Sequence, residues 1–156
     1  MTEPSPLSRP NRDLDRAFGV AGVLLGIAAI VLDVIGVAIG PGFFYLAGLG
    51  VLLGTSTAAV SFGIERFTGD ALREGDIDED TGWLIGKLEN VIVLILVLVG
   101  AWIALSIVFA AKSIVRREDI SSGNTTYYLA GTLLNFTYTI VVGLATRWLI
   151  GFLGIS

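Results

Sequence analysis

The stretch GWLIGKLENVIVLILVLVGAWIALSIVFAAKSIVRR, from Gly82 to Arg117, decides the fold class of this chain. Its centre, Val91 to Ala111, contains 21 consecutive residues without a charge. A helix that rises 1.5 Å per residue needs roughly 20 apolar residues to cross a hydrocarbon core of about 30 Å. The stretch therefore predicts a membrane-spanning segment. Its length leaves open whether residues 82–117 form one long helix or two helices bent at Gly100.

The composition of the whole chain favours the same class. The 156 residues are 54% hydrophobic, and their mean hydropathy is +0.81. A water-soluble domain could not bury so much apolar surface, so the composition indicates an integral membrane protein. The 20 glycines agree with this interpretation, because small residues let membrane helices approach closely.

Four apolar runs predict an all-α, integral membrane four-helix bundle in one transmembrane domain, residues 17–156. The expected helices cover about 17–40, 43–64, 83–116 and 127–153. Residues 1–16, with three prolines and mixed charges, are expected to form a disordered tail, and residues 65–81 an acidic loop. With four passes, the inner side would hold seven Lys and Arg residues and the outer side three. The excess predicts that both termini are cytoplasmic in a cell-membrane protein.

Small residues follow one face of several expected helices. Gly22-x-x-x-Gly26 and Gly50-x-x-x-Gly54 match the pattern that lets two helix backbones come close. In the first and third expected helices, counting 100° per residue, glycines also lie on the same face as the single carboxylate. The residues expected to pack helices are Gly22, Gly26, Gly36, Gly50, Gly54, Gly86 and Gly100.

Isolated charges within apolar runs are costly and need partners. Under the four-pass topology, Asp33 would lie at the level of Lys112, and Glu89 at the level of Arg147. We therefore expect two ion pairs, Asp33–Lys112 and Glu89–Arg147. The alternative is that Lys112, Glu89 and Arg147 reach the headgroups independently.

The last helix has a polar face that includes Asn135 and Thr139. In a membrane-spanning helix, such a face either packs against the bundle interior or lines a polar path for an ion. Together with Asp33, these two residues define the path that a transported ion would follow.

Several kinds of chemistry find no support in the residues. The chain has no cysteine and no histidine, which removes thiol catalysis, Ser–His–Asp triads and the usual zinc ligands. Asp76, Asp78 and Asp80 alternate like the start of a calcium-binding loop, but Lys87 stands where the bidentate glutamate belongs. We expect no catalytic residue, metal or cofactor, and no nucleic-acid partner, because no basic stripe exists. The acidic, lysine-poor loop is typical of proteins from salt-loving archaea, or is simply solvated.

Three motifs in residues 82–145 resemble a known family. They are Ile85-Gly-Lys-Leu-Glu89, Ala110-Ala-Lys-Ser-Ile-Val-Arg116 and Tyr128-Leu-Ala-Gly-Thr-Leu-Leu134. This region looks like the C-terminal part of a domain-of-unknown-function family of prokaryotic multi-pass membrane proteins. The resemblance implies a membrane topology and directs attention to Glu89, Lys112 and Arg116, but implies no reaction.

The residues favour a structural or interaction (scaffold) protein over an enzyme, packed through glycine-rich helix faces. Its expected partners are the lipid bilayer and either a second copy or another membrane protein. The alternative is an oligomeric transporter or channel component that uses Asp33 and the polar face of the last helix. A dry helix interface would favour the scaffold, and a wet cavity at Asp33 or Asn135 the transporter.

Overall fold

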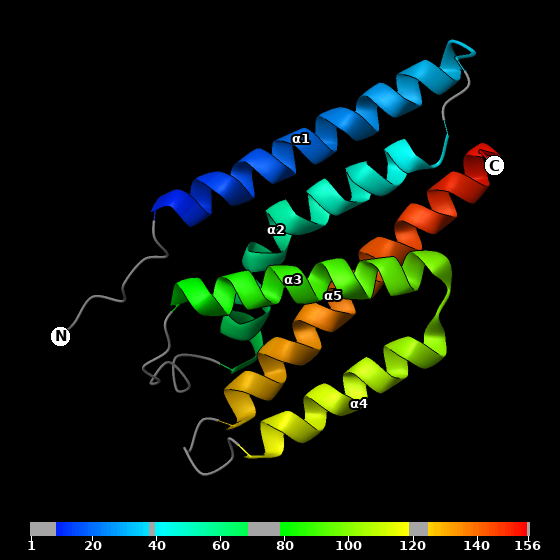
Figure 1. The fold of residues 1–156 in the computed structure, drawn as a ribbon. Helices are drawn as coiled ribbons and strands as arrows, with labels where there is room; N and C mark the ends of the chain where they lie inside the picture. Colours follow the sequence, from blue (N-terminus) through cyan, green and yellow to red (C-terminus); the bar gives the residue numbers. More distant parts are fainter. Residues whose placement is uncertain (1–8, 38–39, 69–78, 119–124, 156) are drawn as a thin grey trace.

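The computed structural model describes residues 9–37, 40–68, 79–118 and 125–155. These residues form five α-helices and, within the described ranges, no strand, which confirms the all-α fold class. The helices are α1 (Arg9–Val34), α2 (Gly42–Thr68), α3 (Glu79–Val99), α4 (Trp102–Glu118) and α5 (Thr125–Leu153) (Figure 1). The stretch 82–117, which the sequence left open as one helix or two, is therefore two helices, α3 and α4, so the described residues form five helices rather than four.

The break between α3 and α4 has a local cause at Gly100. Gly100 has a φ of +73°, which a residue with a side chain adopts only with strain. Its N–H donates to the carbonyl of Val97, and the N–H of Ala101 donates to Leu96. This is the Schellman pattern that ends helices. It recurs at Gly36, which closes α1, and at Gly154, which closes α5.

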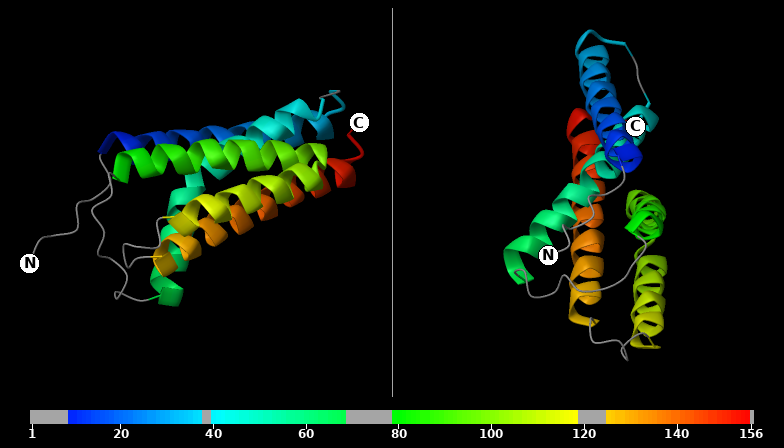
Figure 2. Two further views of the ribbon diagram at one scale, coloured as in Figure 1. Left: turned by 60° about the horizontal axis from the view of Figure 1, so that its bottom comes forward. Right: turned by 90° about the vertical axis from the view of Figure 1, so that its left-hand side faces the viewer.

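Successive helices run in alternating directions (Figure 1). α1 packs mainly against α2, α5 packs against α2 and α3, and α4 lies at the edge beside α3 (Figure 2). Because the five helices alternate in direction, the start of α1 and the end of α5 lie at opposite ends of the bundle (Figure 1). The prediction that both termini are cytoplasmic assumed four membrane passes, and it stays a prediction.

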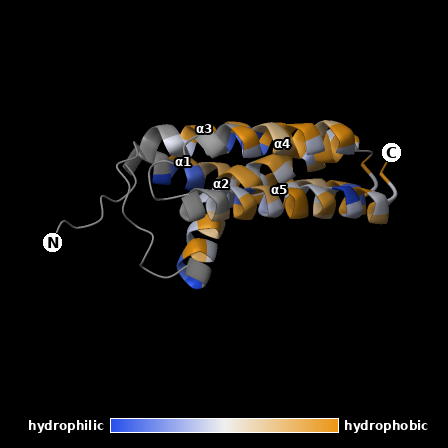
Figure 3. Ribbon diagram, turned by 90° about the horizontal axis from the view of Figure 1, so that it is seen from below, coloured by the Kyte–Doolittle hydropathy of each residue, from blue (hydrophilic) through white to orange (hydrophobic). Residues whose placement is uncertain are grey.

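The bundle exposes more large hydrophobic side chains than it buries. Among the described residues, 30 large hydrophobic side chains are exposed, whereas ten hydrophobic residues are buried. Seven polar or charged residues share that interior, and hydrophobic residues recur along all five helices (Figure 3). Four segments are long and apolar enough to cross a membrane: Arg12–Val34, Gly42–Arg66, Gly82–Val99 and Ala130–Leu153. A water-soluble protein rarely exposes contiguous apolar surface of this extent.

The first two helices are longer than expected. α1 begins at Arg9, so the second half of the expected 1–16 tail is helical; residues 1–8 lie outside the described residues. α2 extends to Thr68 and takes up the first residues of the expected 65–81 loop. The extension of α1 matters for function because it brings Asp15 into the bundle, where it is buried.

Glycines hold α1 directly against α2. A Cβ added to Gly22 would lie 2.3 Å from the backbone nitrogen of Val51, and one added to Gly54 would lie 2.2 Å from the Cα of Gly19. A Cβ added to Gly50 would lie 2.6 Å from the Cα of Gly22. The two backbones therefore touch over about two turns, as in the close packing of small residues in membranes.

The other glycines expected to pack helices have different surroundings. A Cβ on Gly26 would make only an ordinary contact, and nothing lies within 4 Å of one on Gly36 or Gly86. Gly36 and Gly100 act through their positive φ, as helix terminators. The spacing of glycines alone did not separate these roles.

Candidate functional site

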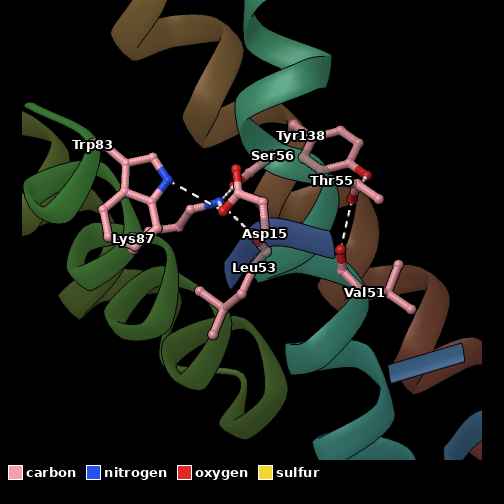
Figure 4. A network of polar contacts seen from close by, with 8 residues as sticks. All are labelled: Asp15, Val51, Leu53, Thr55, Ser56, Trp83, Lys87 and Tyr138. Atoms are coloured by element: carbon pink, nitrogen blue, oxygen red, sulfur yellow. Dashed lines mark hydrogen bonds and ion pairs between the residues drawn. The ribbon is translucent and has the colours of Figure 1, made fainter. Parts of the chain in front are cut away.

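The most buried charged group in the described bundle is Lys87 of α3, whose side chain is 9% exposed. Its Nζ lies 2.8 Å from Oδ1 of Asp15 on α1. It also donates to Oγ of Ser56 at 3.0 Å and to the carbonyl of Leu53, both on α2 (Figure 4). An ammonium group has three donors, and here each has an acceptor. Lys87 therefore joins three helices with no donor left over.

Trp83 completes this cluster from one turn earlier on α3. Its indole Nε1 donates to Oδ1 of Asp15 at 3.1 Å, and its ring centroid lies 5.6 Å from Nζ of Lys87. The Asp15 carboxylate thus accepts from two residues of α3 (Figure 4). A cation near an indole face is also attracted by the ring quadrupole. These contacts fix the N-terminal turns of α1 against α3.

A second ion pair lies on another side of α3. Glu89 pairs with Lys112 of α4, and the two side chains are 26% and 16% exposed. The Lys112 ammonium also lies 5.3 Å from the ring centroid of Phe136 on α5. Phe136 in turn packs edge-to-face with Phe109 of α4 at 5.6 Å between centroids. This group of residues joins α4 to the rest of the bundle.

The expected pairings of these charges were wrong. The structure joins Glu89 to Lys112, whereas the sequence-based pairing was Glu89–Arg147 and Asp33–Lys112. The reason is the turn at Gly100, which folds α4 back along α3. Glu89 lies 11 residues before Gly100 and Lys112 lies 12 residues after it, so the two reach the same level.

Arg147 and Asp33 lie towards the other end of the bundle. Nη1 of Arg147 donates to the carbonyl of Val97 at 3.0 Å, in the last turn of α3. This is a favourable place for a cation, because the carbonyl end of a helix carries the negative end of its dipole. Asp33 is partly exposed near the end of α1, and no partner for its carboxylate is found among the described residues.

The polar face of α5 points into the bundle. Asn135 and Thr139 are both buried. The Thr139 hydroxyl lies 2.9 Å from Oδ1 of Asn90 on α3 and 2.8 Å from the carbonyl of Asn135. It has one hydrogen for these two acceptors. Nδ2 of Asn90 and the hydroxyl of Thr132 are buried without a partner, so the α3–α5 contact is incompletely satisfied.

A hydrogen bond also joins α2 to α5. The hydroxyl oxygens of Thr55 and Tyr138 are 2.6 Å apart. Thr55 donates to the carbonyl of Val51 at 2.6 Å, so the Tyr138 hydroxyl is the donor in the contact between the helices. Every pair of neighbouring long helices other than α1–α2 is therefore joined by at least one polar side chain, and α1–α2 is joined by glycines.

Three residues of this interior escaped prediction from the sequence. Asp15 was assigned to the tail, and neither Lys87 nor Asn90 was given a place in the bundle interior. The available signal was their spacing: Trp83, Lys87 and Asn90 recur every three to four residues, which places them on one face of a helix. Within the described residues no group of three His, Cys, Asp or Glu side chains is placed to hold a metal ion.

Comparison of the chain with protein-family models, with curated proteins and with solved structures finds no match. The resemblance of residues 82–145 to an uncharacterised membrane family therefore stays a prediction. The candidate site is therefore defined by its geometry alone. It consists of the Lys87–Asp15 ion pair, in which every ammonium donor is used, the Glu89–Lys112 pair at the edge of the bundle, and the incompletely satisfied Asn90 amide in the centre.

Proposed function

We propose that this chain is a small multi-pass membrane protein with a structural or interaction role. The observation that carries the proposal is the complete saturation of Lys87. A cation that binds or moves a ligand needs a free donor or a path to water. Lys87 instead uses all three ammonium donors in contacts with α1 and α2. This is what a residue that holds helices together requires.

The arrangement of charges supports an orientation in the membrane. Eight of the ten basic residues lie in the described helices towards the end where α1 begins: Arg9, Arg12, Arg16, Arg66, Lys87, Lys112, Arg116 and Arg117. Arg147 is the one basic residue of the described helices towards the other end, and Arg73 lies outside the described residues. Since Lys and Arg accumulate on the cytoplasmic side, we propose a cytoplasmic N-terminal end and a C-terminal end on the opposite face.

Labelling of single cysteines tests this orientation, because the chain has no cysteine of its own. We expect an impermeant maleimide to label S156C in intact cells, and to label S5C only after permeabilisation. Equal protection of both positions would restore the four-pass topology and contradict five alternating passes.

Reconstitution into liposomes tests the structural role. We expect proton, sodium and potassium fluxes equal to those of protein-free liposomes, together with a stable complex with a second copy or another membrane protein in cross-linked native membranes. A protein-dependent flux that saturates with ion concentration would refute the structural role.

A second candidate, an oligomeric transporter or channel component, is favoured by one observation. The buried amide of Asn90 and the hydroxyl of Thr132 lack partners, and unsatisfied polar groups inside membrane proteins mark candidate ion paths. Flux that N90L abolishes, with the fold intact, would support this candidate. Flux from both N90L and the unmodified chain would place the path elsewhere.

A further inference from the structure

The C-terminal half of α5 passes the turn between α3 and α4 (Figure 1), where Arg147 contacts the last turn of α3. Nη1 of Arg147 donates to the carbonyl of Val97 at 3.0 Å, and the residue is exposed. A guanidinium group has five N–H donors in one plane. The bond to Val97 holds that plane against α3 and leaves the other donors for a ligand. Lys87, by contrast, has no donor left.

A second donor borders the same space. A Cβ built on Gly100 would lie 3.1 Å from Nη1 of Arg147 and 3.9 Å from Nε1 of Trp102, and these are the two described heavy atoms beyond the neighbouring residues within 4 Å of it. The two nitrogens are therefore at most about 7 Å apart, the sum of these distances. The exposed indole of Trp102 finds no acceptor for its N–H among the described residues. Because Gly100 has no side chain, both donors face one open side of the turn.

Two N–H donors at this separation suit the oxygens of one phosphate group. Hydrogen bonds of about 2.9 Å to two oxygens of the same group span the distance between the nitrogens. A guanidinium recognises phosphate oxygens through its fork of N–H groups, and an indole N–H donates but does not accept. Arg147 and the start of α4 offset the negative end of the α3 dipole, so the field at the turn does not oppose an anion.

The surroundings of these donors are those of a membrane interface. The candidate span Gly82–Val99 ends one residue before Gly100. Val99 and Ile103, on the two sides of the turn, are exposed and apolar, and Trp148 is exposed beside Arg147 on α5. Tryptophans at the ends of membrane spans lie at the level of the lipid headgroups. A phosphate at this turn is therefore placed as that of a lipid, with apolar side chains next to its acyl chains.

We propose that Arg147 and Trp102 bind the phosphate of a membrane phospholipid at the turn between α3 and α4. The inference rests on the proposed membrane location but not on the proposed orientation, because both leaflets present lipid phosphates. It separates two kinds of cation in the bundle: Lys87 holds helices together, and Arg147 has donors for a ligand.

Native mass spectrometry of the full chain tests the proposal. The chain is incubated with equal amounts of phosphatidylglycerol and of monoglucosyl diacylglycerol, which has the same acyl chains but no phosphate. We expect the phospholipid to be retained preferentially, and R147Q to lower this preference about fivefold. R16Q is the control, because it removes an exposed arginine near the start of α1, and it should leave the preference unchanged.

A second pair of variants tests the indole donor and leaves the bond from Arg147 to Val97 in place. W102F keeps an aromatic ring but removes the N–H, and it should lower the preference about threefold. W148F removes another exposed indole N–H and should have no effect. Equal losses in W102F and W148F would overturn the proposal, because any interfacial tryptophan would then serve. An undiminished preference in R147K would overturn it too, since a point charge would then replace the guanidinium fork.

The source of the phosphate and the fate of the proposed function are tested separately. Excess inorganic phosphate should not displace the phospholipid; if it does, and also binds the lipid-free chain, the lipid assignment is overturned. If R147Q unfolds, the comparison of W102F with W148F decides the outcome. A chain that resists carbonate extraction from membranes but retains both lipids equally overturns the phosphate site and leaves the membrane role standing. A chain that carbonate extracts overturns both.

Discussion

The two ion pairs of α3 lie two residues apart in sequence and do different work. Lys87 binds partners that lie 31 to 72 residues away along the chain, on α1 and α2. Glu89 binds Lys112 on α4, which the turn at Gly100 already holds beside α3. The first pair, together with Trp83, joins helices that are far apart in the sequence, and the second reinforces a hairpin. Two ion pairs of the same kind can therefore contribute very differently to the stability of the fold.

The largest expected effect is that of Lys87→Met. The substitution leaves the Asp15 carboxylate buried without its cation, and breaking a buried pair in this way costs about 3–5 kcal/mol. SDS titration in mixed micelles should show a correspondingly lower free energy of unfolding. The rearrangement should reach α1 first, because Asp15 is its link to α3.

The control for this prediction removes both charges. K87M/D15L leaves no unpaired charge, so it should recover much of the stability that K87M loses. If K87M and the double variant unfold at the same SDS fraction, the Lys87–Asp15 ion pair contributes no more to the free energy of unfolding than the packing of the lysine methylenes does.

The next largest effect tests whether glycine packing holds α1 against α2. Gly22→Ala would place a Cβ 2.3 Å from a backbone nitrogen of α2, which cannot move away as a side chain could. We expect a loss of about 1–3 kcal/mol in the free energy of unfolding. Gly26→Ala is the matched control on the same helix, because its Cβ would lie 3.6 Å from Ala47. Both substitutions gain the same helix propensity, so equal stabilities would show that the α1–α2 backbones are not in close contact.

The helical class could be predicted from the sequence, because long uncharged segments form few other structures in water or in lipid. The sequence also predicted close glycine packing at Gly22 and Gly50. The number of helices could not be predicted, because it depends on one residue, Gly100, which ends α3 and separates it from α4. Glycine is tolerated within membrane helices, so only its positive φ and the bond from Arg147 to Val97 identify a helix end.

The errors in the site followed from that one turn. A continuous helix would carry Lys112 to the end opposite Glu89, and the expected ion pairs were built on that geometry. Asp15 was missed for another reason: its partners are more than 65 residues away, and local composition marked its surroundings as solvated. The acidic loop lies largely outside the described residues, so its halophilic interpretation stays a prediction.

The smallest expected effect is that of Lys112→Met. Glu89 is 26% exposed and lies about 10 Å from the start of its span, so it can reach headgroups or water when its partner is lost. Polar contacts between membrane helices average about 0.6 kcal/mol, and we expect a loss of about 1 kcal/mol here. The effect should be local: spin labels at S113C and I92C should report a broader α3–α4 distance distribution, with α1 unaffected. K112R should keep the narrow distribution. A loss as large as that of K87M would mean that both ion pairs of α3 hold the whole bundle, and that the covalent turn at Gly100 contributes little to the position of α4.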